Sequence, residues 1–315
     1  MIKTEDLSKV FKIGKKRDQD LVAVDALNLQ VNEGEVFGFL GPNGAGKTTT
    51  VRMLTSLIRP SGGKASINDL QLGKDDTQIR HTVGILTEAP GLYERLSAEK
   101  NLSIFARLYD VGDEEAAVTK YLMMLGLWER RADQVGSFSK GMRQKLAVAR
   151  ALLHEPKVLF LDEPTTGLDP EAAKTVRDFI EELRAQGRTI FMTTHNLDEA
   201  ERLCDRVGIF KQKLLAVDTP KALREKLFGR KSVFHLASVK PEWIPLVEAQ
   251  PHVTLVEQNE NRLVVTLADP EADNPQIVRS LVAVGADIRF IGALRHSLED
   301  IYLELLHSNA DEEHS

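Results

Sequence analysis

Short apolar stretches alternate with amphipathic ones along most of the chain. Three runs near the start have strand character: "IKTEDLSKVF", "LVAVDALNLQV" and "EVFGFLG". A second series begins with "KVLFLDEP" and continues with a helix from about Glu171 to Gln186. It ends with "RTIFMTTH", a helix over Leu197 to Leu203 and "RVGIFKQKLLAV". Strands that alternate with helices predict a parallel sheet covered on both faces, which is the α/β class.

Helical patterns fill the stretch between these two series. Residues from about Ser97 to Glu129 predict helices with polar breaks, as in "SAEKNLSIFARLYDVG". A shorter helix is expected from Val51 to about Leu57, and "RPSGGKASIND" is a turn that leads into a short strand. The segment of about 89–150 is therefore expected to form a helical subdomain.

The pattern changes towards the C-terminus. "DTPKALREKLFG" predicts a helix with Thr219 as N-cap and Pro220 at the first helical position. Next come a strand "SVFHLASV", a helix "PEWIPLVEAQ", a hairpin turning at Glu260–Asn261, a helix "NPQIVRSLVAVGA", a strand "DIRFIG" and a last helix "SLEDIYLELL". That order is typical of a small α+β unit of ferredoxin-like type. We expect a main domain 1–217, a linker helix 218–230, an accessory domain 231–309 and a disordered tail 310–315.

Composition narrows the classes of function. The 315 residues and 35.1 kDa allow about two domains, and the net charge of −6 does not favour nucleic acid as the main partner. The single cysteine, Cys204, excludes an internal disulfide and is expected to be a small core residue. The start "MIKTEDLSKV" is too charged for a signal peptide, and no apolar run approaches the ~18–20 residues of a membrane-spanning helix.

A phosphate-binding loop is the strongest motif. "GPNGAGKT", Gly41 to Thr48, fits G-x-x-x-x-G-K-[ST], and it follows an apolar strand and opens a helix. Its glycines allow a tight loop whose backbone N–H groups converge on phosphate oxygens, and the positive end of the helix adds to that field. Lys47 is expected to reach the β- and γ-phosphates, and the Thr48 hydroxyl to ligate Mg²⁺. The nucleotide-binding residues expected here are Gly41, Pro42, Asn43, Gly44, Ala45, Gly46, Lys47, Thr48 and Thr49.

Two carboxylates and a histidine complete this predicted site. In "VLFLDEP" a buried strand delivers Asp162 and Glu163 at its C-terminal end, where α/β folds place their chemistry. Asp162 suits the Mg²⁺ shell, and Glu163 suits a general base that polarises water for attack on the γ-phosphate. "FMTTHN" repeats the layout with His195, which is expected to hydrogen-bond the γ-phosphate and position that water.

A second stretch also has the character of an anion site. In "GSFSKGMRQKLAVAR", Ser139 suits the N-cap of a helix and Gly141 would let a ligand approach the backbone closely. Because the chain already has one phosphate-binding loop, this second stretch is expected to bind a different nucleotide or to have another role.

These elements together resemble the ATP-binding subunit of an ABC transporter. The phosphate loop alone would admit kinases and GTPases, whereas the combination with "SFSKGMRQK", "LFLDEP", "GLDP" and "TTHN" is far more specific and covers most of residues 2–217. The resemblance implies a P-loop NTPase fold with an antiparallel β subdomain and a helical subdomain, in addition to the small C-terminal α+β domain. It also implies ATP and Mg²⁺ as cofactors and ATP hydrolysis as the activity.

The resemblance answers the question about the second stretch. In the family the loop of Ser139 to Met142 binds the γ-phosphate of ATP held by a second subunit, so Ser139 and Gly141 are expected to face a partner's nucleotide. Asp169 in "GLDP" resembles the residue that couples the two sites. Phe11 is the expected aromatic to stack on adenine, with a core aromatic as the alternative. The partners implied are a second copy of the ATPase and an integral membrane permease, at the cytoplasmic face of the membrane.

Two positions depart from the family pattern. The usual signature is close to L-S-G-G-Q, whereas here Lys140 stands between the serine and the glycine and adds positive charge. Where the family places a glutamine that touches Mg²⁺, this chain has Glu88. A carboxylate can still ligate Mg²⁺, although it adds negative charge beside the triphosphate. Both departures and the added C-terminal domain resemble bacterial exporters with separate membrane subunits, with the sodium- and drug-extruding branch nearest.

Two other classes of function stay open at this point. One is a soluble ATPase that acts on ribosomes or DNA, although such proteins typically pair two nucleotide cassettes or carry long coiled coils. The other is a small-molecule kinase, for which "SFSKGMRQK" would have no role.

Overall fold

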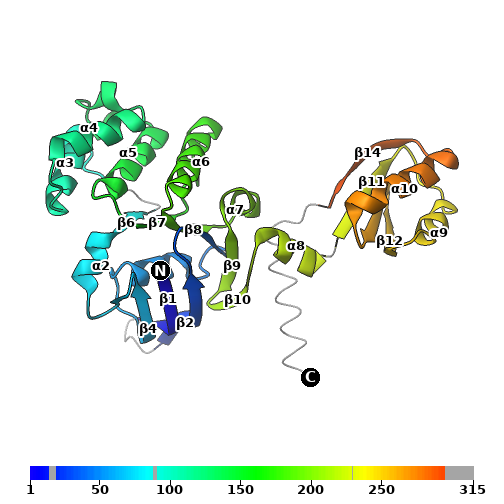
Figure 1. Ribbon diagram of the computed structural model, residues 1–315, viewed down its shortest axis with the longest axis horizontal. Coiled ribbons are helices and arrows are strands. Elements are labelled where there is room, and N and C mark those ends of the chain that lie inside the picture. Colours follow the sequence, from blue (N-terminus) through cyan, green and yellow to red (C-terminus); the bar gives the residue numbers. More distant parts are fainter. Residues whose placement is uncertain (14–18, 88–90, 229, 295–315) are drawn as a thin grey trace. The chain divides into compact units, whose positions relative to one another are not determined.

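The computed structural model of the protein describes residues 1–13, 19–87, 91–228 and 230–294. Two compact units make up the chain, Met1–Pro220 and Lys221–Ser315 (Figure 1). Glu88, the last predicted helix and the predicted tail lie outside the described residues.

A six-stranded sheet forms the centre of the first unit. Its strand order is β10-β9-β3-β8-β7-β6, and all neighbours are parallel except β10, which runs antiparallel to β9. The strands are β3 (Val36–Leu40), β6 (Val83–Leu86), β7 (Val158–Asp162), β8 (Thr189–Thr194), β9 (Arg206–Lys211) and β10 (Lys213–Asp218). The predicted parallel sheet is therefore confirmed, with one antiparallel strand added at its edge.

Burial on both faces explains why these strands are apolar along their whole length. Every residue of β3, β7 and β8 is buried, as expected for strands covered on both sides. Phe39 lies at their centre, with its ring 5.3 Å from that of Phe191 and 4.5 Å from that of Phe210. The run "RVGIFKQKLLAV", predicted as one strand, is two, because Gln212 adopts a left-handed φ of 59° and reverses the chain.

A separate antiparallel sheet packs against this core. Its order is β2-β1-β4-β5, formed by β1 (Ile2–Ile13), β2 (Gln19–Val31), β4 (Gly62–Ile67) and β5 (Leu70–Gln71). Buried residues such as Ile2, Leu27 and Ile67 join the same apolar cluster as Phe39 and Phe210. Both of the first two predicted strands and the antiparallel β subdomain are confirmed.

Helices cover the parallel sheet, and three of them pack on one another as the helical subdomain. These three are α3 (Ala98–Leu108), α4 (Glu114–Met124) and α5 (Lys140–Leu152). The helix predicted from Val51 begins earlier, at Lys47, directly after the phosphate loop. The remaining helices of this unit are α1 (Lys47–Leu54), α2 (Asp76–Thr82), α6 (Pro170–Ala185) and α7 (Leu197–Leu203).

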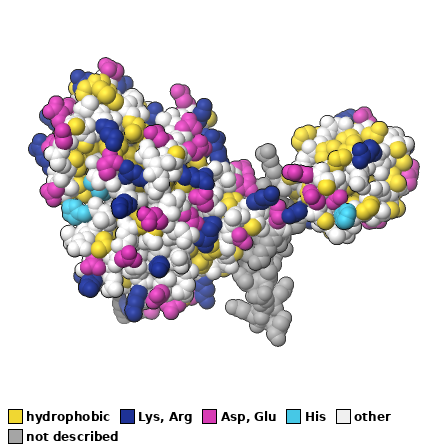
Figure 2. Space-filling model, viewed as in Figure 1, with side chains coloured by type: hydrophobic (Ala, Val, Ile, Leu, Met, Phe, Trp, Pro, Cys, Tyr) yellow, Lys and Arg dark blue, Asp and Glu magenta, His cyan; other side chains and the backbone are white. Residues whose placement is uncertain are grey.

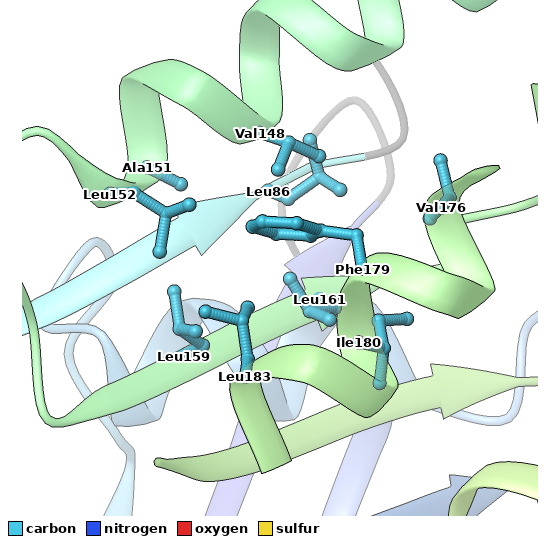
Figure 3. Close-up of a pocket in the computed structure, with 10 residues that line it drawn as sticks. All are labelled: Leu86, Val148, Ala151, Leu152, Leu159, Leu161, Val176, Phe179, Ile180 and Leu183. Atoms are coloured by element: carbon cyan, nitrogen blue, oxygen red, sulfur yellow. The ribbon is translucent and has the colours of Figure 1, made fainter. Parts of the chain in front are cut away.

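Apolar packing joins α5 and α6 to the sheet. Figure 3 shows ten apolar side chains from α5, α6, β6 and β7 that enclose a cavity of about 10 Å³, with Phe179 near its middle. A space of that size would hold about one water, but its lining offers water no polar partner. The contact is therefore a dry one that holds the helical subdomain against β7.

The second unit has the connectivity of a ferredoxin-like fold. Its antiparallel strands lie in the order β12-β13-β11-β14, and two helices bury Trp243, Val247, Ile277 and Leu281 against them. The helix predicted as a linker is α8 (Pro220–Phe228), and all of it beyond Pro220 belongs to the second unit. The unit's other elements are β11 (Arg230–Leu236), α9 (Trp243–Glu248), β12 (Val253–Asn259), β13 (Arg262–Leu267), α10 (Pro270–Ala283) and β14 (Ile288–Ala293). Over the residues that the structure describes, no helix has the length and hydropathy needed to cross a bilayer.

A charged cluster ties the end of α5 to α4 and β8. The carboxylate of Glu155 accepts hydrogen bonds from Lys120 Nζ and the Tyr121 hydroxyl, both at 2.5 Å, and pairs with Arg188. Partial burial opposes the ionised form, but these hydrogen bonds outweigh it and lower the pKa of Glu155 to about 2. The cluster is thus strongest when Glu155 is charged.

Glu155→Gln should lower the free energy of unfolding by about 1 kcal/mol at pH 7, as expected for a partly exposed ion network. Because the folded-state pKa lies below that of the unfolded chain, the native contribution is full above the unfolded pKa of about 4.3 and is lost as pH falls through about 2. Denaturant unfolding of both proteins across this range measures the difference, with the exposed Glu129→Gln as a control. A difference that stays constant with pH would contradict the assignment.

Candidate active site

The loop between β3 and α1 can fold only with glycines at two places. A side chain at Gly41 would lie 2.1 Å from the carbonyl oxygen of Phe210, and one at Gly46 would lie 2.1 Å from that of Ala23. Gly46 also has a φ of +105°. It precedes α1 without a side-chain cap, so the first N–H groups of that helix are available to an anion.

Lys47 is buried and held inside this loop. Its ammonium donates hydrogen bonds to the carbonyl oxygens of Gly41, at 2.6 Å, and Pro42, at 3.2 Å. It also lies 3.3 Å from Oε1 of Glu163. The loop therefore presents a fixed positive charge beside free helix N–H groups, an arrangement that fits phosphate oxygens.

A cavity of about 440 Å³ opens over the loop. It is lined by Phe11, Leu21, Val22, Ala23, every residue from Pro42 to Thr49, Glu163, Thr166, His195 and Gln212. The structure thus brings together the predicted loop, both predicted catalytic side chains and Phe11. Its volume falls in the range of small-molecule and cofactor sites.

The two predicted carboxylates stand at the carboxyl end of β7. Asp162 is buried, and its Oδ1 accepts a hydrogen bond of 2.6 Å from the Thr193 hydroxyl. Glu163 has a left-handed φ of 52°, which turns its side chain out of the strand direction. Its backbone N–H donates to Oγ1 of Thr193 at 3.0 Å, so one threonine orders both acids.

Glu163 is surrounded by groups that fix its carboxylate. Oε2 accepts from Oγ1 of Thr166 at 2.9 Å and lies 2.8 Å from Nδ1 of His195. Oε1 is buried and faces Lys47, but it accepts no hydrogen bond from the part of the chain that the structure describes. Its partner among these residues is therefore the charge of Lys47 alone, whereas Oε2 has two hydrogen-bonding partners.

Sequence reasoning missed Thr166 and Thr193. Thr193 is the register partner of Asp162 across β7 and β8, so its role depends on strand pairing that the motif alone does not reveal. A further layer was also missed: buried Glu199 accepts from Thr165, at 2.5 Å, and from Thr194, at 3.0 Å. The only signal in the sequence is that hydroxyl residues flank both the acidic motif and His195.

Ser139, Gly141 and Asp169 form a different group, and the structure does not place them among the residues that line the cavity. Exposed Ser139 caps α5 by accepting from the N–H of Met142 at 3.2 Å, and Asp169 caps α6 by accepting from that of Ala172 at 2.9 Å. A side chain at Gly141 would lie 2.7 Å from Cβ of Ala172 and 3.8 Å from Oδ2 of Asp169. The missing side chain of Gly141 thus allows close packing of α5 on α6, and its predicted approach to a ligand stays a prediction.

The residues fit a nucleotide with Mg²⁺ better than a metal held by protein alone. Within the described residues, no group of three or more His, Cys, Asp and Glu side chains could hold a metal ion. Mg²⁺ typically takes one or two carboxylates and completes its shell with water and substrate phosphates. Buried Asp162 and the half-buried Thr48 suit that mode, and a role for Glu88 stays a prediction outside the described residues.

Known families match both parts of this chain. Residues 24–166 match the family described as "ABC transporter", and residues 219–306 match "ATP-binding protein DrrA1-3-like, C-terminal domain". The bacitracin transport ATP-binding protein BcrA of Bacillus licheniformis is 36% identical over 307 residues, which cover 97% of each chain. The daunorubicin resistance ATP-binding protein DrrA2 of Streptomyces coeruleorubidus is 34% identical over 311 residues, covering 96% of this chain and 94% of that protein.

Solved structures agree on the fold. The ATP-binding cassette MJ0796, solved as a dimer in a post-hydrolysis state with ADP and Pi, has a TM-score of 0.64 and 25% identity, covering 70% of this chain and 99% of that one. An ATP-binding subunit of an ABC transporter has a TM-score of 0.64 and 31% identity, covering 73% and 94%. The chain is thus a P-loop ATPase of the cassette type. It belongs to the ATP-binding subunits of ABC transporters, and its C-terminal domain is of the DrrA kind.

The position of Phe11 at the cavity generates a test. Its half-buried ring lies among Leu21 and Val22, with the ammonium of Lys9 5.0 Å from the ring centroid. If adenine stacks on this ring, Phe11→Ala should raise the Kd for ATP by about ten-fold, because stacking of a base on an aromatic side chain is worth ~1–3 kcal/mol. Phe11→Tyr should bind as the parent does. Titration with a fluorescent ATP analogue measures both, and an unchanged Kd for Phe11→Ala would make Phe11 a packing residue only.

Proposed function

We propose that two copies of this chain bind two ATP molecules with Mg²⁺ between them, and that hydrolysis drives a separate membrane-embedded exporter subunit. One observation carries the proposal: Ser139 and Asp169 lie at helix ends outside the cavity that holds Lys47 and Glu163. The positive end of the α5 dipole and the exposed ammonium of Lys140 both favour an anion beside Ser139. The dimeric form in which the related cassette was solved with ADP and Pi supports a partner's nucleotide as that anion.

Each residue of the cavity has a defined part in this proposal. Lys47 and the loop N–H groups bind the β- and γ-phosphates, and Thr48 and Asp162 would hold Mg²⁺, which neutralises charge on the phosphates. Glu163 orients the attacking water and accepts its proton. Nδ1 of His195 lies 2.8 Å from Oε2 of Glu163 and keeps that carboxylate in place. When Nδ1 donates to Glu163, the ring can donate to a phosphate from Nε2 only as an imidazolium.

We infer the direction of transport from the names of relatives, since the residues of the site do not bear on it. Relatives that align along nearly the whole chain include proteins named for daunorubicin resistance and for linearmycin resistance. We therefore propose a drug-extruding exporter whose membrane subunit selects the substrate, with this chain at the cytoplasmic face. On the face that Figure 2 shows, acidic and basic side chains are interspersed over the first unit, which gives no support to a nucleic-acid stripe there.

An ATPase acting on ribosomes or DNA is the alternative. Purification of the tagged chain from native membranes separates the two: recovery with an integral membrane protein supports the exporter, and recovery with ribosomes or DNA supports the alternative. A small-molecule kinase would leave a phosphorylated acceptor, whereas an exporter ATPase releases inorganic phosphate.

Glu163→Gln should bind ATP but stop turnover, because an amide cannot take the proton of water. With saturating ATP and Mg²⁺ it should double its mass from 35.1 kDa in light scattering. Adding Ser139→Asp should abolish that dimer, since aspartate still caps α5 but repels a γ-phosphate. Ser137→Asp, on the same exposed segment, is the matched control and should leave the dimer intact. A Glu163→Gln protein that stays monomeric, or a dimer indifferent to Ser139→Asp, would contradict the proposal.

A further inference from the structure

Lys140 reaches from the start of α5 to the segment that follows Glu163. Its ammonium donates a hydrogen bond of 3.1 Å to the backbone carbonyl of Thr166. The next residue, Gly167, has a φ of +69°, and a side chain there would lie 2.1 Å from Nζ of Lys140. The turn at 166–167 is therefore shaped around the lysine head group, and a glycine leaves room for it.

Thr166 carries this contact on to the carboxylate. Its hydroxyl donates to Oε2 of Glu163 at 2.9 Å, and its backbone N–H donates to the carbonyl of Glu163 at 3.2 Å. Thr166 thus links Lys140 to Glu163, because its carbonyl accepts from the lysine and its hydroxyl donates to the carboxylate. Oε2 is also the oxygen that faces His195.

A second hydrogen bond joins α5 to the same segment, but this one is buried. Gln144, one turn along the helix, is buried and donates from Nε2 to the carbonyl of Pro164 at 2.8 Å. This inner contact is closed to solvent, whereas Lys140 and Thr166 are both exposed. The buried contact fixes the helix on the segment, and a charged ligand can reach the exposed one.

We propose that Lys140 is a positioning residue for Glu163, acting through Thr166. Lys140 lies in the loop that is proposed above to meet the partner's ATP, so the inference rests on that proposed function. The ammonium holds the carbonyl of Thr166, which keeps the threonine hydroxyl on Oε2 and the Glu163 carboxylate in one orientation. An ammonium has three N–H donors, so it can donate to a γ-phosphate beside Ser139 and to the Thr166 carbonyl together. The contact that orients the base of one site thus also faces the nucleotide of the other.

A double-mutant cycle on ATP hydrolysis by the full chain tests this connection. Lys140→Ala and Thr166→Val should each lower kcat by about five- to ten-fold, in the range of a lost charge-assisted hydrogen bond, with KM for ATP within about two-fold. The double variant should be no slower than the slower single one, because both changes break the same connection. Lys140→Arg should restore most of kcat, since a guanidinium can donate to the same carbonyl. Lys174→Ala, an exposed lysine on α6, is the control and should leave kcat unchanged.

The outcomes separate this inference from the function on which it rests. The positioning role would be overturned if the losses in kcat multiplied in the double variant. It would also be overturned if Lys140→Ala left kcat unchanged or raised only KM. In each case Glu163→Gln would still be inactive, and the proposed function would stand. Turnover by Glu163→Gln at the parent rate would instead remove the base itself, and both proposals with it. A stability loss without rescue by Lys140→Arg would reduce the lysine to a packing role and also overturn the inference.

Discussion

Parallel pairing of β3, β8 and β7 places the carboxyl ends of three strands side by side, and the nucleotide site depends on that register. Lys47 follows the first strand, His195 the second and Glu163 the third. The Lys47 ammonium lies 3.3 Å from the Glu163 carboxylate, and Nδ1 of His195 lies 2.8 Å from it. The strands can lie there only because both of their faces are buried, with Phe39, Phe191 and Phe210 packed at the centre. Packing of the core therefore sets the geometry of the chemistry.

Close packing also brings two capped helix ends together. At Gly141, α5 approaches α6 so closely that a side chain there would lie 2.7 Å from Cβ of Ala172, and the N-caps Ser139 and Asp169 lie beside this contact. Neither N-cap is among the residues that line the cavity over the phosphate loop. In the proposed dimer such a chain would hold one half of two different sites. Lys140 and Gln144 connect α5 to the segment 163–167 that begins with Glu163.

Much of this follows from the sequence, because the motifs are local. The loop 41–48, the acids at the end of an apolar strand and the N-cap at Ser139 are each set by a few neighbouring residues, and the structure has all three. Short or register-dependent features were not predictable. The strand β6 and the helix α2 are too short to show a period, the reversal at Gln212 rests on one left-handed residue, and Thr166 and Thr193 reach the acids only after strands and turns have paired. The ligand role of Gly141 stays a prediction, and its close tertiary contact with Ala172 could not be predicted because it depends on how α5 packs on α6.

The claim that each site is shared by two copies can be tested with a photoreactive group on the γ-phosphate of ATP. A tagged Lys47→Met copy, which should not hold nucleotide, is mixed with an untagged Glu163→Gln copy that binds ATP and does not turn it over. The account predicts that the label attaches to the tagged copy, within the loop 139–142. Label found only on the untagged copy that binds the nucleotide would contradict the account.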